Sequence, residues 1–300
     1  MGRQARRPRV SVLALVSILL SGWVPGTTLA QALLPAKGNF DVGIYYTDVL
    51  NKNHYLPNGD ELDVGHTRAH SVAVTLQYSP TDKILLTAGL PFVRSRYYGS
   101  RPHPTEIDNG DFHSSITDLQ LSAHYQLLGG PVALAPFIVL IVPVKDYEAL
   151  GHAAPGRHLR EQWVGFSTGA SLNDWIPRSY VQLRYSYGFV EKVANLGHDH
   201  SNVDLEFGYF ATPSLSLLAT ASRQFAHGGI PVPVPPTHPL YAYHDQLAAT
   251  TFLTLGAGAS WSPRGNINYN VFYARAVSGT NGHKLDGSLT VGFNMRFSTR

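Results

Sequence analysis

The 300-residue sequence contains no cysteine, few charged residues (14%) and many aromatic ones (11%), a composition that excludes a disulfide framework and is unusual for a soluble domain. Its formal net charge of +3 depends on the N-terminus, because the first thirty residues hold four of the 23 Lys and Arg and none of the 20 Asp and Glu, which leaves 19 − 20 = −1 beyond them. That balance excludes a composition-based argument for binding nucleic acid or an anionic membrane surface.

The first thirty residues have the order of a secretory signal peptide. Four arginines within residues 3–9 precede an apolar run from Val10 to Leu20, and small residues follow. This is the usual sequence of basic region, apolar region and cleavage site. We expect cleavage after Ala30 or Ala32, so that residues 1–30 form the signal peptide of an exported protein and residues 31–300 form one domain.

Alternating segments of about ten residues recur through the rest of the chain. In "YVQLRYSYGF" (180–189), apolar residues occupy one parity and mostly polar residues the other. A period of two places the two kinds of side chain on opposite faces of a strand. We predict twelve strands: Asn39–Leu50, Thr67–Tyr78, Ile84–Tyr97, Ser115–Leu127, Val132–Val144, Gln162–Leu172, Tyr180–Val190, Asn202–Phe210, Ser214–Phe225, Ala248–Trp261, Asn266–Val277 and Lys284–Ser298.

The predicted connections are alternately long and short. Five short turns, such as "SPTDK" and "TP", follow the even-numbered strands. The longer loops are rich in Gly, Pro, Asn, Asp and His and cover residues 51–66, 98–114, 145–161, 191–201, 226–247 and 278–283. This asymmetry is typical of an even-stranded antiparallel barrel with both termini on the short-turn side.

Aromatic residues recur near both ends of the predicted strands. Amphipathic rings favour the headgroup level of a membrane, so two such belts indicate two membrane surfaces. The sequence therefore predicts an all-β fold, a transmembrane antiparallel up-and-down β-barrel of about 12 strands with short periplasmic turns and long extracellular loops. The belts are Tyr78, Tyr125, Tyr209, Trp261 and Phe297 toward the short turns, and Tyr46, Phe92, Tyr187, Phe225 and Tyr273 toward the long loops.

The main alternative is a secreted β-sandwich or lipocalin-like barrel, whose strands also alternate. In such a protein the polar parity would face water and carry many charges, whereas here it is mostly Ser, Thr, Gly, Gln and Asn. The longest apolar run after the signal, "PVALAPFIVLIVPV" (131–144), contains three prolines and so does not suit a transmembrane helix. We therefore expect the barrel to lie in the outer membrane of a Gram-negative bacterium.

The polar parity of the clearest strands supplies candidates for the lumen. Interior charges can pair across a barrel and constrict it, and interior residues set selectivity. The simpler interpretation, which we favour, is that these side chains fill and hydrate a narrow interior. The candidates are Asp118, Gln120, His124, Gln182, Arg184, Asp204, Glu206, Asn268, Asn294 and Arg296.

The chain contains 14 histidines, most of them in or beside the predicted loops. "HTRAH" and "GHDH" bring imidazoles close together in the sequence, and imidazole suits zinc, copper or nickel. Weak candidate metal ligands are therefore His66, His70, His198 and His200. Because no compact Cys, His or carboxylate motif accompanies them, solvated loop histidines are the favoured interpretation, and no cofactor is expected.

Several segments resemble an outer-membrane family named for the meta-pathway of phenol degradation. They are "DNGDFHSSITDLQLSAHYQLL" (108–128), "APFIVLIVPVKDY" (135–147) and a final strand ending in "GFNMRF". The chain departs from the family where Pro143-Val144-Lys145-Asp146 replaces Pro-Thr-Gly. The resemblance implies a β-barrel and, by association, passage of hydrophobic or aromatic compounds. It extends distantly to long-chain fatty-acid channels, whose N-terminal plug has no counterpart in the few residues before Asn39.

The sequence thus predicts an outer-membrane channel for passive uptake of small, hydrophobic or aromatic solutes. Its expected partners are outer-membrane lipids, the solute and the outer-membrane assembly machinery, with no nucleic acid. One alternative is a metal-ion-related protein with histidine-rich loops. Another is a lipid-modifying outer-membrane enzyme, which requires a Ser and a His within hydrogen-bonding reach on the lipid-facing side. We expect no enzyme, because the clear in-strand histidine, His124, has the lumen parity and no Gly-x-Ser-x-Gly element is present.

Overall fold

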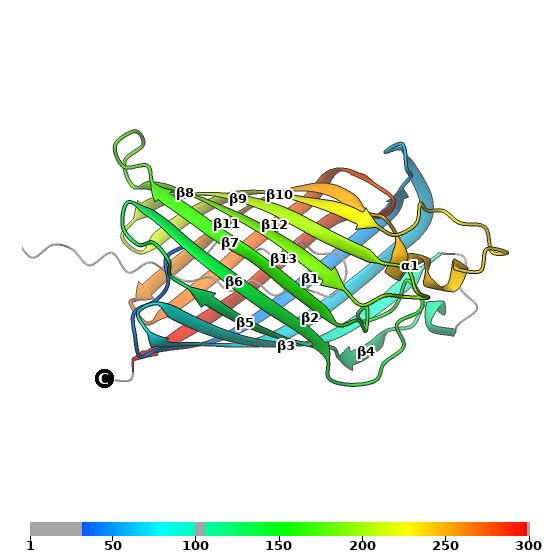
Figure 1. Ribbon diagram of the computed structural model, residues 1–300, viewed down its shortest axis with the longest axis horizontal. Coiled ribbons are helices and arrows are strands. Elements are labelled where there is room, and N and C mark those ends of the chain that lie inside the picture. Colours follow the sequence, from blue (N-terminus) through cyan, green and yellow to red (C-terminus); the bar gives the residue numbers. More distant parts are fainter. Residues whose placement is uncertain (1–31, 100–105, 299–300) are drawn as a thin grey trace, which may run out of the picture.

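The computed structural model describes residues 32–99 and 106–298, and the predicted signal peptide lies outside them. Strands account for most of the chain (Figure 1). None of the helices in the described residues is long and apolar enough to cross a membrane. The strands are β1 (Asn39–Tyr55), β2 (Glu61–Thr81), β3 (Ile84–Tyr98), β4 (His113–Ile116), β5 (Asp118–Tyr125), β6 (Val132–Pro143), β7 (Glu161–Ser171), β8 (Ser179–Val190), β9 (His198–Thr212), β10 (Leu215–Gly228), β11 (Thr251–Arg264), β12 (Ile267–Thr280) and β13 (Gly282–Ser298).

The strands form one closed antiparallel sheet. Consecutive strands pair along the chain, β2 pairs with β3, and β1 pairs with β13 from Asn39↔Ser298 to Tyr55↔Gly282. Among the described residues, every strand except the short β4, which pairs only with β3, has a partner on both sides. Such closure is the condition for a sheet to span a membrane. The predicted all-β barrel is confirmed, with twelve strands in the wall if β4 and β5 are counted as one interrupted strand.

The interruption between β4 and β5 lies at Thr117. Both short strands pair with β3, β4 with Phe92–Ser95 and β5 with Ile84–Gly89. Leu90 and Pro91 of β3 lie between these ladders, and Pro91 has no N–H to donate. The Pro91 carbonyl still accepts a hydrogen bond from the Thr117 N–H at 3.1 Å, so the two strands remain joined at the break.

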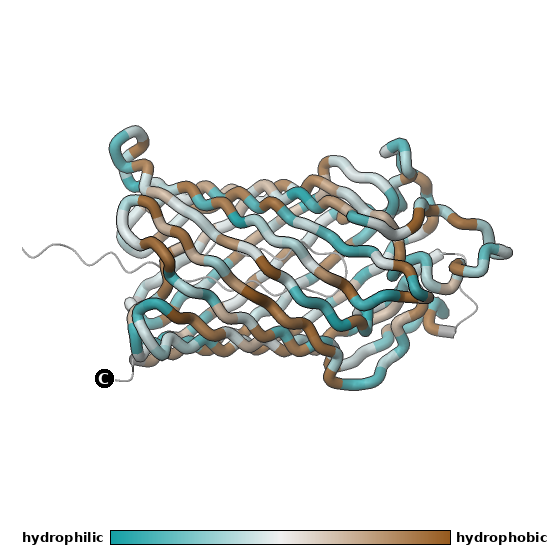
Figure 2. The backbone as a smooth tube through the Cα atoms, in the orientation of Figure 1, coloured by the Kyte–Doolittle hydropathy of each residue, from teal (hydrophilic) through white to brown (hydrophobic). Residues whose placement is uncertain are grey.

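The two faces of the wall differ as the alternation predicts. Large apolar side chains of one parity are exposed on the outer surface, whereas the residues between them are buried inside. Figure 2 shows this alternation as brown and pale segments along the strands. Eight of the ten aromatic residues predicted at the two belts, including Tyr78, Trp261, Tyr46 and Phe92, are among these exposed outer residues, whereas Tyr187 and Tyr209 are half-buried.

Two predicted long loops are wrong, because strands occupy most of their residues. β1 continues to Tyr55 and β2 begins at Glu61, so only residues 56–60 connect the two strands. Likewise, β12 and β13 leave only Asn281 between them, with a φ of 54°. Cross-strand pairs such as His54↔Leu62 keep the β1–β2 ladder continuous beyond the predicted strand ends.

The long-loop end, at the right of Figure 1, is covered by chain. Residues 106–112 include the 3-10 helix η1 (Glu106–Asp108), and residues 229–250 include η2 (Tyr241–Tyr243) and the short helix α1 (His244–Leu247). Leu247 is fully buried against Leu159, Val190 and Val193, so the 229–250 loop packs on the loop 144–160 and on the end of β8.

Residues 32–38 lie at the short-turn end before β1 begins. Gln182 of β8 accepts a hydrogen bond from the Ala32 N–H at 2.8 Å. The Gln126 side chain, just after β5, donates to the Ala32 carbonyl and accepts from the Leu34 N–H, both at 2.8 Å. Because Gln182 and Gln126 have the interior parity, this N-terminal segment reaches across the inside of the barrel.

Candidate functional site

The predicted lumen residues have the interior parity of their strands, and most of them contact other interior groups. Asp118, Glu206, Asn268 and Asn294 are buried. The Tyr180 hydroxyl donates to Glu206 Oε1 at 2.8 Å, and the Ser222 hydroxyl donates to Asp204 Oδ1 at 2.5 Å. At these positions the interior side chains are therefore linked by a network of hydrogen bonds.

Two further groups of lumen residues lie near the short-turn end. Arg296 donates to both carboxylate oxygens of Asp41 at 2.8 Å, across the β1–β13 seam. On the neighbouring strands, Asn268 joins Asn270 and Asn294 through amide hydrogen bonds of 2.9 and 3.3 Å. The Asp41–Arg296 pair links the first strand of the wall to the last and so stabilises closure of the barrel, whereas the asparagine group joins the consecutive strands β12 and β13.

An apolar strip runs along the inner wall on β6 and β7, and no candidate residue had indicated it. Phe137, Val139, Ile141 and Trp163 are buried and form one cluster. Arg184 lies over the Phe137 ring at 4.3 Å from its centroid, and the His124 ring lies 5.1 Å away. The available signal was that "PFIVLIV" (136–142) is apolar on both parities, which puts apolar side chains inside as well as outside.

The loop 144–160 is anchored inside the long-loop end. The Asp108 carboxylate of η1 accepts from the backbone N–H groups of His152 at 3.2 Å and Ala153 at 2.8 Å. The Thr67 hydroxyl of β2 donates to the His152 carbonyl at 3.3 Å. Nearer to β6, the Tyr147 hydroxyl donates to Asp118 Oδ1 at 2.7 Å. This loop is therefore held against the wall from three sides.

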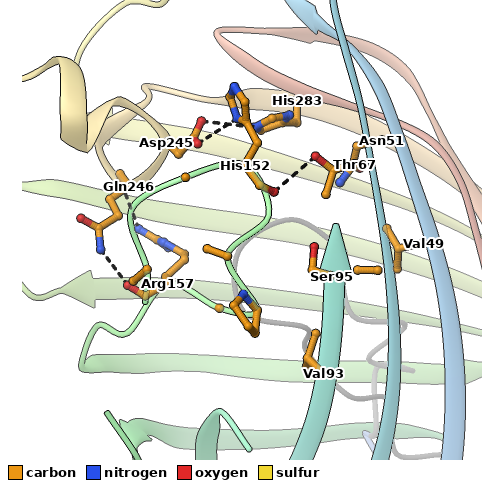
Figure 3. Close-up of a pocket in the computed structure, with 16 residues that line it drawn as sticks. Val49, Asn51, Thr67, Val93, Ser95, His152, Arg157, Asp245, Gln246 and His283 are labelled. Atoms are coloured by element: carbon orange, nitrogen blue, oxygen red, sulfur yellow. Dashed lines mark hydrogen bonds and ion pairs between the residues drawn. The ribbon is translucent and has the colours of Figure 1, made fainter. Parts of the chain in front are cut away.

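Around His152 the structure gathers a group that we call the His–Asp cluster: His54, His152, Asp245 and His283. Their ligand atoms all lie within 4.8 Å of one another. His283 Nδ1 is 3.0 Å from His54 Nε2, and His283 Nε2 is 3.1 Å from His152 Nδ1. Asp245 Oδ2 is 2.9 Å from His152 Nδ1, and Asp245 Oδ1 is 3.2 Å from His283 Nε2. Figure 3 shows the side chains of His152, Asp245 and His283 converging.

Opposing effects set the charges of the loop members of this cluster. Burial alone would raise the pKa of the Asp245 carboxyl, but the neighbouring imidazoles, His152 foremost, hold its pKa well below the ordinary value. Burial lowers the pKa of His152, yet the charge and hydrogen bond of Asp245 outweigh it, so that pKa is raised. Asp245 is thus a carboxylate at neutral pH and the source of negative charge in the cluster.

The four histidines singled out from the sequence lie in three different surroundings. On the outer face, His66 stacks on Tyr98, and His70 Nδ1 lies 2.8 Å from the Tyr46 hydroxyl. His198 and His200 are buried on the inner face of β9, with ring centroids 6.1 Å apart. Arg157 Nη1 lies 3.3 Å from His200 Nε2, which makes this pair a poor place for a second cation.

The sequence could not group the His–Asp cluster because its members come from distant parts of the chain: β1, the loop 144–160, α1 and β13. His54 has the outward parity of Ile44 and Tyr46, but register shifts between Leu50 and His54 turn it inward. The only sequence signal was the high number of histidines near the ends of strands.

A Ser–His pair also lies on the outer face, where a lipid-modifying enzyme would need one. Ser201 Oγ of β9 is 2.7 Å from His227 Nε2 of β10, and the His227 ring stacks on Tyr187. The nearby Asp199 carboxylate accepts from the Val190 N–H at 2.9 Å and the Tyr187 hydroxyl at 3.3 Å. This carboxylate is thus bonded to groups other than the imidazole it would have to orient.

No model of a known protein family matches the sequence, and no curated protein matches it either. Among solved structures, the COG4313 outer membrane channel from Pseudomonas putida F1 is similar, with a TM-score of 0.69 and 17% identity over 88% of this chain and 97% of that one. The β domain of the Bordetella autotransporter BrkA has a TM-score of 0.50 and 10% identity over 87% of this chain and 100% of that one. At these identities the likeness establishes the fold, and that fold is the one found in outer-membrane β-barrels.

Proposed function

We propose that this protein is an outer-membrane channel of a Gram-negative bacterium, through which small hydrophobic or aromatic solutes diffuse passively. The proposal rests mainly on the apolar strip of Phe137, Val139, Ile141 and Trp163 on the inner wall. A barrel that only filled its interior with polar side chains would not need such a strip, whereas an apolar solute gains contacts there that it lacks in water. The likeness of fold to an outer membrane channel supports the same class of function.

The orientation that we propose follows from the two ends of the barrel. Short turns and the chain termini belong on the periplasmic side of such barrels, and longer loops face the outside. The loop residues 106–112, 144–160 and 229–250 therefore cover the extracellular mouth. In this orientation β13 brings the exposed Phe297 to the periplasmic end, where the assembly machinery would meet the final strand.

The solute class can be tested by flux into proteoliposomes, comparing an aromatic compound, a sugar and a divalent metal ion. We expect Phe137→Ser to lower aromatic flux several-fold while leaving sugar flux unchanged, because the hydroxyl removes an apolar surface from the wall. Phe272→Ser is the matched control, since Phe272 is also a buried interior aromatic but lies on β12, away from the strip. Equal loss from both variants, or preference for sugar in the wild type, would refute this solute class.

The Ser201–His227 pair favours one second candidate, a lipid-modifying enzyme. Acyl transfer would need Ser201 Oγ as nucleophile and His227 as base, a contact that the 2.7 Å separation allows. The same proteoliposomes distinguish the two functions, because lipid hydrolysis that disappears in Ser201→Ala supports the enzyme. Aromatic flux that is unaffected by Ser201→Ala, without lipid hydrolysis, supports the channel.

A further inference from the structure

We propose that the His–Asp cluster binds one divalent transition-metal ion of the zinc type. The inference is independent of what passes through the barrel. It rests on the convergence of four potential ligands from four separate elements: His54 of β1, His152 of the loop 144–160, Asp245 of α1 and His283 of β13.

The donor set has the chemistry and size of a tetrahedral zinc site. Three imidazole nitrogens and one carboxylate oxygen are common zinc ligands, and bond lengths of about 2.0–2.1 Å separate neighbouring ligand atoms by about 3.3 Å. His152 Nδ1 lies 3.1 Å from His283 Nε2 and 2.9 Å from Asp245 Oδ2, and His283 Nε2 lies 3.2 Å from Asp245 Oδ1. His54 Nε2 contacts the other nitrogen of the His283 ring, Nδ1, at 3.0 Å, and the four potential ligand atoms, one from each residue, all lie within 4.8 Å of one another. Small side-chain adjustments would therefore place one nitrogen of each ring and one oxygen around a common centre.

The ligands are held in place by the residues behind them. The His152 side chain is 1% exposed, and its backbone N–H is fixed by Asp108. The His244 Nε2 lies 3.5 Å from Asp245 Oδ1, while its Nδ1 contacts the Tyr241 carbonyl at 2.6 Å. Outer groups that orient the ligands in this way are a regular part of metal sites.

Electrostatics distinguish this cluster from the other buried histidine pair. Asp245 brings negative charge to the centre of three imidazoles and so attracts a cation. At His198 and His200, by contrast, the neighbouring charge is the Arg157 guanidinium. Among buried groups a charge of the wrong sign outweighs the presence of suitable ligand atoms.

A small cavity gives the cluster access to water. Its volume is about 90 Å³, and its lining includes His152, Asp245 and His283 together with the polar side chains of Asn51 and Ser95 (Figure 3). A cavity of that volume with polar groups in its lining is large enough to hold water. An ion entering through this cavity could exchange hydration water for protein ligands beside it.

A bound ion would join both covering loops to the barrel wall. His54 and His283 belong to adjacent wall strands, whereas His152 and Asp245 belong to the loops that cover the mouth. Without an ion, the Asp245 carboxylate accepts hydrogen bonds from His152 and His283. The metal-bound and metal-free arrangements can be distinguished by measuring metal binding, because only the first contains an ion.

The test uses the full mature chain refolded in detergent, stripped with a chelator, and titrated with Zn²⁺ against a chromophoric competitor. We expect about one tightly bound ion per chain. Asp245→Asn and His283→Gln should each weaken binding at least about 100-fold, since even outer groups at metal sites contribute 10–100-fold. His198→Ala, which removes a buried histidine outside the cluster, should bind as the wild type does.

The folded state of each variant is checked by its migration in detergent gels with and without boiling. If a variant does not fold, the proposal is tested on the wild type alone by titration with Co²⁺. Four-coordinate Co²⁺ complexes absorb visible light far more strongly than the hydrated ion does. A strong visible spectrum at one equivalent supports the site. Absence of stoichiometric Zn²⁺ binding by the wild type, or equal binding by His283→Gln and His198→Ala, overturns the proposal.

Discussion

At the scale of single residues, interior charges hold distant strands together. Asp41 and Arg296 are directly opposite in the β1–β13 register and make two hydrogen bonds of 2.8 Å. The Asp41 side chain is 4% exposed, so its carboxylate depends on this partner instead of on water. Bidentate geometry makes such a pair stronger and more directional than an ordinary ion pair.

We expect Arg296→Met to destabilise the folded barrel by about 3–5 kcal/mol, because it leaves a buried carboxylate without its cation. The double variant Arg296→Met with Asp41→Leu should recover most of that loss, since neither charge remains. Urea unfolding in lipid bilayers measures both. If the double variant loses as much free energy of unfolding as Arg296→Met and Asp41→Leu lose together, the interaction between the two side chains contributes little.

At the scale of elements, the N-terminal segment before β1 makes contacts of its own inside the barrel. Residues 32–38 are too few for a domain, yet Gln126 and Gln182 bind the backbone of Ala32 and Leu34 across the barrel. The segment therefore occupies interior space at the short-turn end. The sequence supplied its length but not its direction, because nothing in "ALLPAKG" (32–38) indicates a partner on β8.

Deleting residues 32–36 should raise the single-channel conductance in planar bilayers, because it removes chain from the inside of the barrel. Exchanging Leu33 and Leu34 for serine keeps the length and backbone contacts, and should change conductance less than the deletion does. A deletion variant with wild-type conductance would show that the narrowest point lies elsewhere, for example under the covering loops.

Three features of the strands were not predicted from the sequence pattern of each strand taken alone. Alternation located the twelve wall segments, but β1 and β2 extend well beyond the apolar pattern because backbone pairing alone continues them. The break at Thr117 depends on Pro91 lying opposite it, which is a matter of register between strands. The apolar strip on the inner face of β6 follows from a sequence run in which the residues of both parities are apolar, so this strip could have been predicted.

At the scale of the whole molecule, a closed wall presents an apolar surface outward. Leu205 and Leu183 are opposite each other on β9 and β8, and Leu205 is 45% exposed. The reverse arrangement, with apolar side chains inside and charges outside, belongs to soluble barrels. The face that meets lipid can therefore be tested by one charge.

Leu205→Arg should cost about 2–4 kcal/mol in bilayer unfolding, as charged residues do near the middle of the lipid face. Leu205→Phe at the same site should cost little, since an aromatic ring is also apolar. The wild type should migrate differently in gels before and after boiling. Identical migration, or equal damage from the two substitutions, would contradict the assignment of the outer face to lipid.

The local pattern of the sequence was enough to predict the all-β class, the twelve segments of the wall, the outward face of the regular parts of the strands and the short turns at one end. These depend on local patterns with a period of two and on turn chemistry, which the chain carries residue by residue. Which interior groups come into contact depends instead on the three-dimensional arrangement of strands and loops. The His–Asp cluster needs a bulge to turn His54 inward, a loop fixed by Asp108 to place His152, and the pairing of β1 with β13 to bring His283 beside them.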